Sequence, residues 1–184
     1  IDVTQQKKTE QSLKIAEENY RSIFENALEG IFQSTPEGHY LNVNPAMAKI
    51  YGYDSPEEMI NNVKHISQQI YVDSQKRKEF KFLLEKQDYI KDFEYQIYLK
   101  DRQIIWLEEN TRAVRDNEGN LLYYEGIVQD ITQRKIKEKM LQKQIEELRI
   151  SIDENKKQQE VKSIIESDYF QELKANVHQL RINS

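Results

Sequence analysis

Residue types that carry catalysis or metal binding are scarce in this chain. None of its 184 residues is cysteine, which excludes disulfides, thiolate metal sites and cysteinyl-flavin photochemistry. The five glycines form neither a phosphate-binding loop nor a dinucleotide-binding fingerprint, and neither a His-Glu-x-x-His motif nor a two-metal carboxylate spacing occurs. The sequence therefore predicts no catalytic residue, no metal centre and no enzyme.

Polar residues within an apolar strand pattern are the strongest chemical signal. Residues 93–99 alternate between two faces, and continuing that alternation through the next two strands defines one inward face. The positions on that face are Tyr95, Ile97, Leu107, Glu109, Thr111, Tyr124, Gly126 and Val128. Glu109 and Thr111 need hydrogen-bond partners if they are buried. They bind a small polar ligand with the tyrosine hydroxyls, or join an internal network such as Glu109 with Tyr95 or Tyr124, or lie at a solvated strand end.

Helical segments precede these strands. Residues 5–28 space their apolar side chains at helical intervals, and Gly30 is expected to end that helix. Asn44, Ser55 and Asp73 are typical N-caps, the first two being followed by proline at the first helical position. Each cap therefore predicts the start of a further helix.

The strand pattern completes the fold prediction. Two short β-like runs surround the Pro-Glu-Gly turn within residues 30–44, and three longer strands lie within residues 92–131. This order of helices and strands predicts an α+β domain with a five-stranded antiparallel sheet and helices on one face.

A repeated sequence segment indicates the domain boundaries. "DVTQQKKTEQSL" near the start and "DITQRKIKEKML" near the middle align at one constant offset, which pairs Asp2 with Asp130 and Leu13 with Leu141. That spacing suits one small domain rather than a solenoid repeat. We expect one complete unit of an array and the tail of the unit before it.

Several segments, in order, resemble a PAS domain. The matching pieces are "NYRSIFENALEGIFQSTPEGHYLNVNPAMAKIYGYDSPEEMI", "KDFEYQIYLKDRQIIWLEENTRAVRDNEGN" and "YYEGIVQDITQRK". The resemblance covers residues 20–135 and implies the PAS fold flanked by signalling helices. It implies one unit of a tandem PAS array in a bacterial-type, cyanobacterial-like multidomain signalling protein. Where the family usually has glycine after "KD", this chain has Arg102, which predicts a different turn or a left-handed Asp101.

The Asp-Ile-Thr motif at residues 130–132 is expected to form a rigid corner between the sheet and the following helix. Thr132 is predicted to cap the following helix by accepting a backbone hydrogen bond, and Asp130 places a carboxylate near its positive end. Ile131 anchors the strand end in the core or at a helix interface. The resemblance implies that these three residues couple the sheet to the helix; the alternative is a helix cap without signalling.

The resemblance also raises the question of a ligand, because PAS domains often hold haem, flavin or a metabolite. The longest domain helix, residues 73–88, has no histidine, which leaves His65 as the conceivable haem ligand against a surface role. His39 lies in the hairpin. His178 in "NVHQLR" resembles a kinase phosphoacceptor segment, but the acidic residue and Thr-Pro are missing, so we expect an ordinary exposed residue. We expect no cofactor; flavin bound without an adduct remains the alternative.

The C-terminal segment has a coiled-coil pattern. Its apolar seam is Leu141, Ile145, Leu148 and Ile152, with a and d spacing, and Asn155 continues the register. A shorter seam of Leu13, Ala16, Tyr20 and Ile23 precedes the domain, and a second amphipathic helix starts at Ser167 or Asp168 with Phe170, Leu173, Val177 and Leu180. We expect a parallel homodimer through these helices; the alternative is a helix packed on its own domain.

Composition limits the partners. Net charge is −5 and basic residues are scattered among acidic ones, so nucleic acid is not expected as a partner. No apolar stretch is long enough for a membrane span, so we expect no membrane contact from this segment and a cytoplasmic location.

The expected domains are 1–19 as the end of a preceding unit with its linker helix, 20–132 as the PAS domain, 133–166 as a coiled-coil-like signalling helix, and 167–184 as a second helix leading to an absent output or next domain. The resemblance implies a sensor or dimerisation module that relays conformational signals to an output domain outside this chain. That output is the histidine kinase of a two-component system, or a nucleotide or diguanylate cyclase; its partners include the neighbouring PAS units. The alternative is a small-molecule or non-covalent flavin sensor.

Overall fold

The structure is a computed structural model that describes residues 3–172 and 174–175. The chain divides after Gln133 into two compact units. The predicted positions Asp2, Leu173, Val177, His178 and Leu180 lie outside the described residues.

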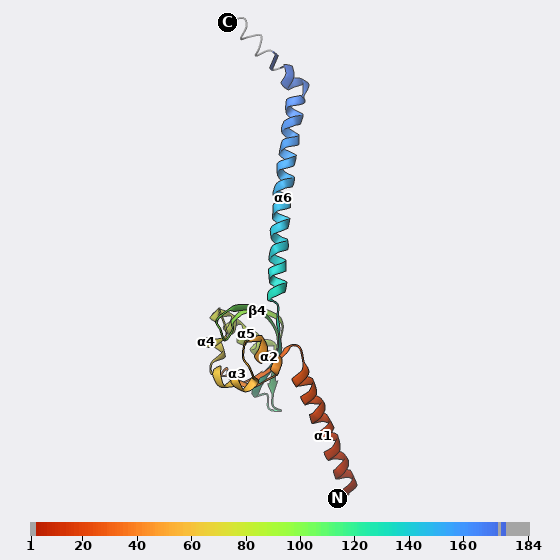
Figure 1. Cartoon of the computed structure of the whole chain (residues 1–184), viewed down its shortest axis with the longest axis vertical. Helices are drawn as coiled ribbons and strands as arrows, with labels where there is room; N and C mark the ends of the chain where they lie inside the picture. Colours follow the sequence, from red (N-terminus) through yellow and green to blue (C-terminus); the bar gives the residue numbers. More distant parts are fainter. Residues whose placement is uncertain (1–2, 173, 176–184) are drawn as a thin grey trace. The chain divides into compact units, whose positions relative to one another are not determined.

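The first unit has the predicted α+β architecture (Figure 1). Its helices are α1 (Val3–Asn26), α2 (Pro45–Ile50), α3 (Pro56–Asn62), α4 (Ile66–Gln69) and α5 (Ser74–Gln87). Its strands are β1 (Gly30–Ser34), β2 (Tyr40–Val43), β3 (Tyr89–Tyr98), β4 (Ile104–Arg115) and β5 (Leu121–Asp130). All strand pairs are antiparallel, in the order β2-β1-β5-β4-β3. Helix α6 (Thr132–Glu166) follows β5.

The predicted N-caps start the helices by the expected bonds. Asn44 Oδ1 accepts from Met47 N at 2.9 Å, and Ser55 Oγ accepts from Glu58 N at 3.1 Å. Asp73 Oδ1 accepts from Gln75 N at 2.8 Å, at the start of α5. These side chains satisfy backbone donors that a helix leaves unpaired at its N-terminus.

The core lies between the helices and one face of the sheet. Phe80 of α5 is fully buried and meets the Phe93 and Tyr124 rings edge to face, at centroid distances of 5.8 and 6.2 Å. Leu84, one turn further along α5, is also fully buried. The predicted apolar face of α5 therefore packs on the inward side of the sheet.

Two local expectations need correction. Helix α1 ends at Asn26, and Gly30 opens β1 instead of ending the helix. Glycine suits this strand position because a Cβ there would meet Val128 Cγ2 at 2.6 Å. In the hairpin after β3, Arg102 itself is left-handed, with a φ of 70°. Its guanidinium lies 5.0 Å from the Tyr98 ring centroid, a contact that offsets part of that backbone cost.

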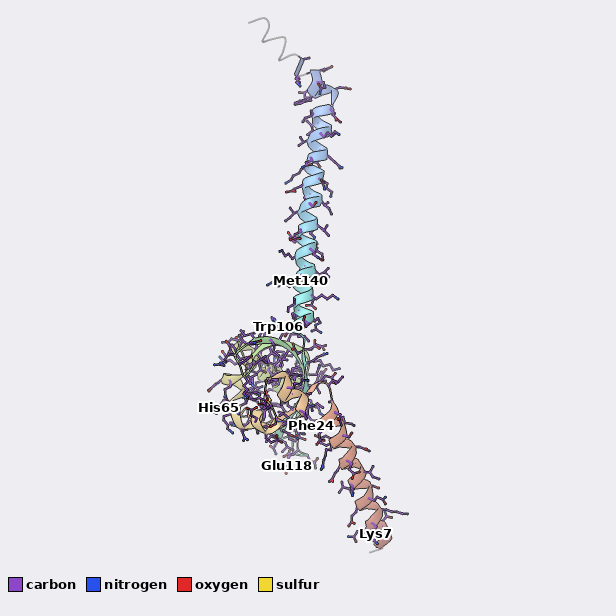
Figure 2. The ribbon with its side chains drawn as sticks, viewed as in Figure 1. Lys7, Phe24, His65, Trp106, Glu118 and Met140 are labelled. Carbon is purple, nitrogen blue, oxygen red and sulfur yellow. The ribbon has the colours of Figure 1, made fainter. Side chains whose placement is uncertain are left out.

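The second unit contains most of α6, described here by itself. None of its helical residues from Thr132 to Glu166 is buried, and side chains project from the helix on all sides along its length (Figure 2). The helix is interrupted at Ser167, whose Oγ accepts a hydrogen bond from Phe170 N at 3.3 Å. Residues 168–172 are helical, as predicted. Within the described part of the chain, none of the helices has the length and hydrophobicity of a bilayer-spanning helix.

Candidate functional site

The carboxylate of Glu109 is the centre of a buried polar network. Glu109 is 3% exposed on β4; Thr111 Oγ1 donates to its Oε1 at 2.6 Å, and the Tyr95 hydroxyl donates to its Oε2. Burial raises the pKa of Glu109 above its ordinary value, although the bonds from Thr111 and Tyr95 and the charge of Arg77 oppose that rise. The predicted internal network is thus present through Tyr95.

The other residues of the predicted inward face lie where the alternation placed them. The buried members are Tyr95, Ile97, Leu107, Glu109, Thr111, Tyr124 and Val128, each at most 4% exposed. Gly126 lies opposite Thr111 in the β4–β5 pair, and a Cβ on it would meet Thr111 Oγ1 at 2.2 Å. The absence of a side chain there makes room for the Thr111 hydroxyl that bonds Glu109. A ligand role for this face stays a prediction.

Sequence reasoning missed Arg77, the cation of this site. Arg77 is 6% exposed on α5, and its Cζ lies 4.9 Å from the Phe80 ring centroid and 5.6 Å from that of Tyr71. Its Nε and Nη2 atoms are buried, and no hydrogen-bond partner for them is present among the described residues. The spacing of Arg77, Phe80 and Leu84 along the helix was the available signal, because it places the arginine on the apolar face.

A small cavity separates these groups. Its volume is about 10 Å³, and its polar lining consists of Arg77, Glu109, Ser34 and four tyrosines, namely Tyr40, Tyr51, Tyr71 and Tyr95. That volume is about what one water molecule needs. Burial raises the pKa of all four tyrosines, which keeps their hydroxyls neutral. A larger open hollow of about 540 Å³ lies elsewhere, against residues such as Gln33, Arg112 and Ile127, and contains neither Arg77 nor Glu109.

The corner at residues 130–132 joins the last strand to α6, but not by the predicted cap. Thr132 is the first residue of α6, not the residue before it, and its Oγ1 accepts from Trp106 N on β4 at 3.0 Å. Ile131 is 3% exposed, and its N donates to Trp106 O at 2.9 Å. Asp130 Oδ1 accepts from Thr132 N at 2.8 Å, so its carboxylate does lie at the helix start. The corner therefore ties the beginning of α6 to β4, and a signalling role for it stays a prediction.

The end of α1 is tied to the domain by Asn44. This side chain is fully buried, and its Nδ2 donates to Phe24 O of α1 at 3.1 Å and to Glu29 O at 3.0 Å. Its Oδ1 accepts from Ile31 N of β1 at 2.9 Å as well as from Met47 N. Asn44 thus links α1, β1 and α2, a function that its N-cap signature alone did not predict.

The predicted helix seams are exposed. Leu141, Ile145, Leu148 and Ile152 on α6 are between 44% and 63% exposed, and Leu13, Tyr20 and Ile23 on α1 are between 56% and 70% exposed. His39 and His65 are also exposed, and their ring centroids lie 5.4 Å apart. Figure 2 shows His65 at the periphery of the domain. His65 does not line the cavity, which supports its surface interpretation. Among the described residues, no group of three or more potential metal ligands is present.

Residues 40–128 match the family model described as PAS fold. The PAS domain of a Colwellia psychrerythraea protein superposes with a TM-score of 0.55 at 20% identity, covering 64% of this chain and 98% of its own. A sensory box histidine kinase/response regulator from Burkholderia thailandensis E264 is 25% identical with a TM-score of 0.55, covering 71% of this chain and 97% of its own. A domain of the sensory box sensor histidine kinase/response regulator from Geobacter sulfurreducens is 25% identical with a TM-score of 0.51, covering 64% of this chain and 96% of its own. A search of the curated proteins gave no match.

Proposed function

The chain contains a PAS domain, and from that premise we propose that it is a dimeric relay module, cytoplasmic and part of a longer signalling protein. It receives a conformational change through α1, passes it through the sheet, and delivers it through α6 to an output domain outside this chain. The output is a histidine kinase or a nucleotide or diguanylate cyclase. The kinase is favoured by the sensory box histidine kinase relatives at 25% identity.

The observation that carries the proposal is that both flanking helices are hydrogen-bonded to the core at their near ends. Asn44 holds the end of α1 against β1, and Thr132 holds the start of α6 against β4. Strand β5 lies between β1 and β4 and leads directly into α6. A shift of either helix therefore acts on one of the two strands that flank β5 in the same sheet, and packed elements transmit such shifts as units.

The seam of α6 supports dimerisation. A 35-residue helix with no buried residue lacks the apolar packing that normally stabilises helices in proteins. Leu141, Ile145, Leu148 and Ile152 follow one another at a and d spacing, and pairing with a second copy buries all of them. Full burial of such a side chain contributes roughly 1.5–3 kcal/mol. Parallel pairing of two chains also aligns α1 with α1 and α6 with α6, as a relay requires.

Sedimentation of matched lysine variants tests this proposal. Ile145→Lys with Leu148→Lys places like charges across the seam and should give a folded monomer or a much weaker dimer. The control, Met140→Lys with Ile150→Lys, adds the same charge at exposed apolar positions outside the seam and should dimerise as the wild type does. A monomeric wild type, or a seam variant that dimerises as tightly as the wild type, contradicts the relay.

A second candidate, a small-molecule sensor, is favoured by the Nε and Nη2 atoms of Arg77, which lack a hydrogen-bond partner among the described residues and lie beside a cavity. The cavity of about 10 Å³ is far below the roughly 300–1,000 Å³ of sites for drug-sized ligands. A flavin would therefore require the surrounding side chains to move apart. Absorbance and native mass of the purified protein distinguish the candidates: colour or extra mass favours the flavin sensor, and a colourless dimer of the chain mass favours the relay.

A further inference from the structure

His39 and His65 lie next to each other on the surface of the domain, although they belong to distant segments of the sequence. Both side chains are exposed, and their ring centroids are 5.4 Å apart with the ring planes tilted by 54°. The hydrogen bonds between His39 and Thr35 use the backbone N and O of His39, and His65 precedes α4 without a side-chain capping bond. The ring nitrogens of both histidines are therefore available to solvent or to an ion.

The backbone holds the two histidines in this position. Gly38 O accepts from Ile66 N at 3.0 Å, so the residue before His39 is bonded to the residue after His65. Ile66 is 4% exposed and thus anchored in the core, and His65 N donates to Gln69 Oε1 at 2.8 Å. Two ligands that the fold has already brought together lose little conformational freedom on binding.

The geometry of the pair suits a shared metal ion. Zinc lies about 2.0–2.1 Å from each imidazole nitrogen, and at a tetrahedral angle two such rings have centroids roughly 5 Å apart. The observed separation is 5.4 Å. The nitrogen lone pairs lie in the ring planes, so two rings in separate parallel planes could not direct them to one point. Planes tilted by 54° intersect, which allows both rings to direct a nitrogen at the same ion.

We propose that His39 and His65 bind one Zn²⁺ ion, or another divalent ion that prefers imidazole such as Cu²⁺, with solvent as the remaining ligands. Among the described residues no group of three potential metal ligands exists, so the protein supplies two. Magnesium and calcium, which prefer oxygen ligands, are therefore not expected at this site. A search for local metal motifs misses the pair, because its ligands come from the β1–β2 hairpin and from the start of α4. The site lies within one domain and does not rest on the relay.

Zinc titration of the chain, prepared without a histidine tag, tests this site, because the sequence has three histidines and no cysteine. The ring resonances of His39 and His65 should shift together and saturate at one ion per chain, while those of His178 stay in place. His39→Ala and His65→Ala should each lower the affinity measured by calorimetry by about tenfold or more, because either variant leaves a single ligand. His178→Ala is the matched control and should bind zinc as the wild type does.

Both substituted side chains are exposed, so the variants should keep the fold, and the ring resonances of the wild type decide the question without them. The proposal is overturned if no ring shift saturates, or if only one of the two rings responds. It is also overturned if His178→Ala weakens zinc binding as much as the other two variants do. Saturable binding of Mg²⁺ with the affinity of Zn²⁺ would show that imidazole is not the ligand.

Discussion

The hydrogen bond from Trp106 N to Thr132 Oγ1 gives a sharp prediction for the corner between sheet and helix. Thr132→Val replaces the hydroxyl with a methyl group of similar shape and removes an acceptor at 3.0 Å from a partly buried donor. Threonine and valine have similar helix propensities, so the helix itself should not change. The loss is then that of one hydrogen bond from a backbone N–H to a side-chain oxygen.

The size of the effect follows from the burial of that bond. A net hydrogen bond contributes about 1 kcal/mol, and a buried donor left without an acceptor costs about 1–3 kcal/mol. Because the site is partly buried, we expect Thr132→Val to lower the free energy of unfolding by about 1–2 kcal/mol. That corresponds to roughly 5–30-fold faster exchange of the Trp106 amide if it exchanges by local opening.

Chemical denaturation and amide hydrogen exchange measure the two effects. Thr132→Ser is the matched control, because it keeps the acceptor oxygen and loses only a methyl group; it should stay close to the wild type. Unchanged stability and unchanged Trp106 exchange in Thr132→Val refute the assignment. Equal effects of valine and serine refute it too, because the methyl group and not the bond would then be responsible.

Three further predictions concern other parts of the domain. The raised pKa of Glu109 stabilises the folded state at pH values below the ordinary glutamate pKa of 4.5, and this stability is lost as the pH rises through the folded-state pKa. Glu109→Gln should remove this pH dependence of the free energy of unfolding, as measured by denaturation at several pH values. The same pH dependence in the variant and the wild type would contradict it. Gly126→Ala places a Cβ 2.2 Å from Thr111 Oγ1 and should lower the free energy of unfolding by about 1–3 kcal/mol, with wild-type stability as the contrary result. Arg102→Gly relieves a left-handed backbone and should be more stable than Arg102→Ala by about 1 kcal/mol, since both lose the contact with the Tyr98 ring; an equal or greater stability of the alanine variant counts against the strain.

Local chemistry explains why much of the fold could be predicted. Asn44, Ser55 and Asp73 start helices by bonds within three residues of themselves, so the signal is complete in the sequence. The alternation that buries Tyr95 and Glu109 is likewise a local property of extended chain. Both kinds of signal can be recognised in the sequence without knowing which segments meet in space.

The features that escaped prediction depend on distant segments. Thr132 was expected to accept a hydrogen bond from its own helix, and the bond from Trp106 N depends on β4, a strand distant in sequence. In the sequence, Arg77 is one of several charged residues in a charged helix, so its burial is not evident. That burial depends on the packing of α5 over the tyrosines of other elements. The four hydrogen bonds of Asn44 require α1, β1 and α2 to converge on one side chain.

Disulfide trapping along α6 tests the parallel dimer most directly, because the chain has no cysteine of its own. Leu141→Cys and Ile152→Cys should each form an intermolecular disulfide under mild oxidation, since both positions face their own copies in a parallel seam. Lys143→Cys, on the outer side of the same helix, should not. In an antiparallel pair only one of the two seam positions can face its own copy. Trapping at both seam positions and not at Lys143→Cys is the predicted result; trapping at one seam position, at neither, or equally at all three contradicts the relay.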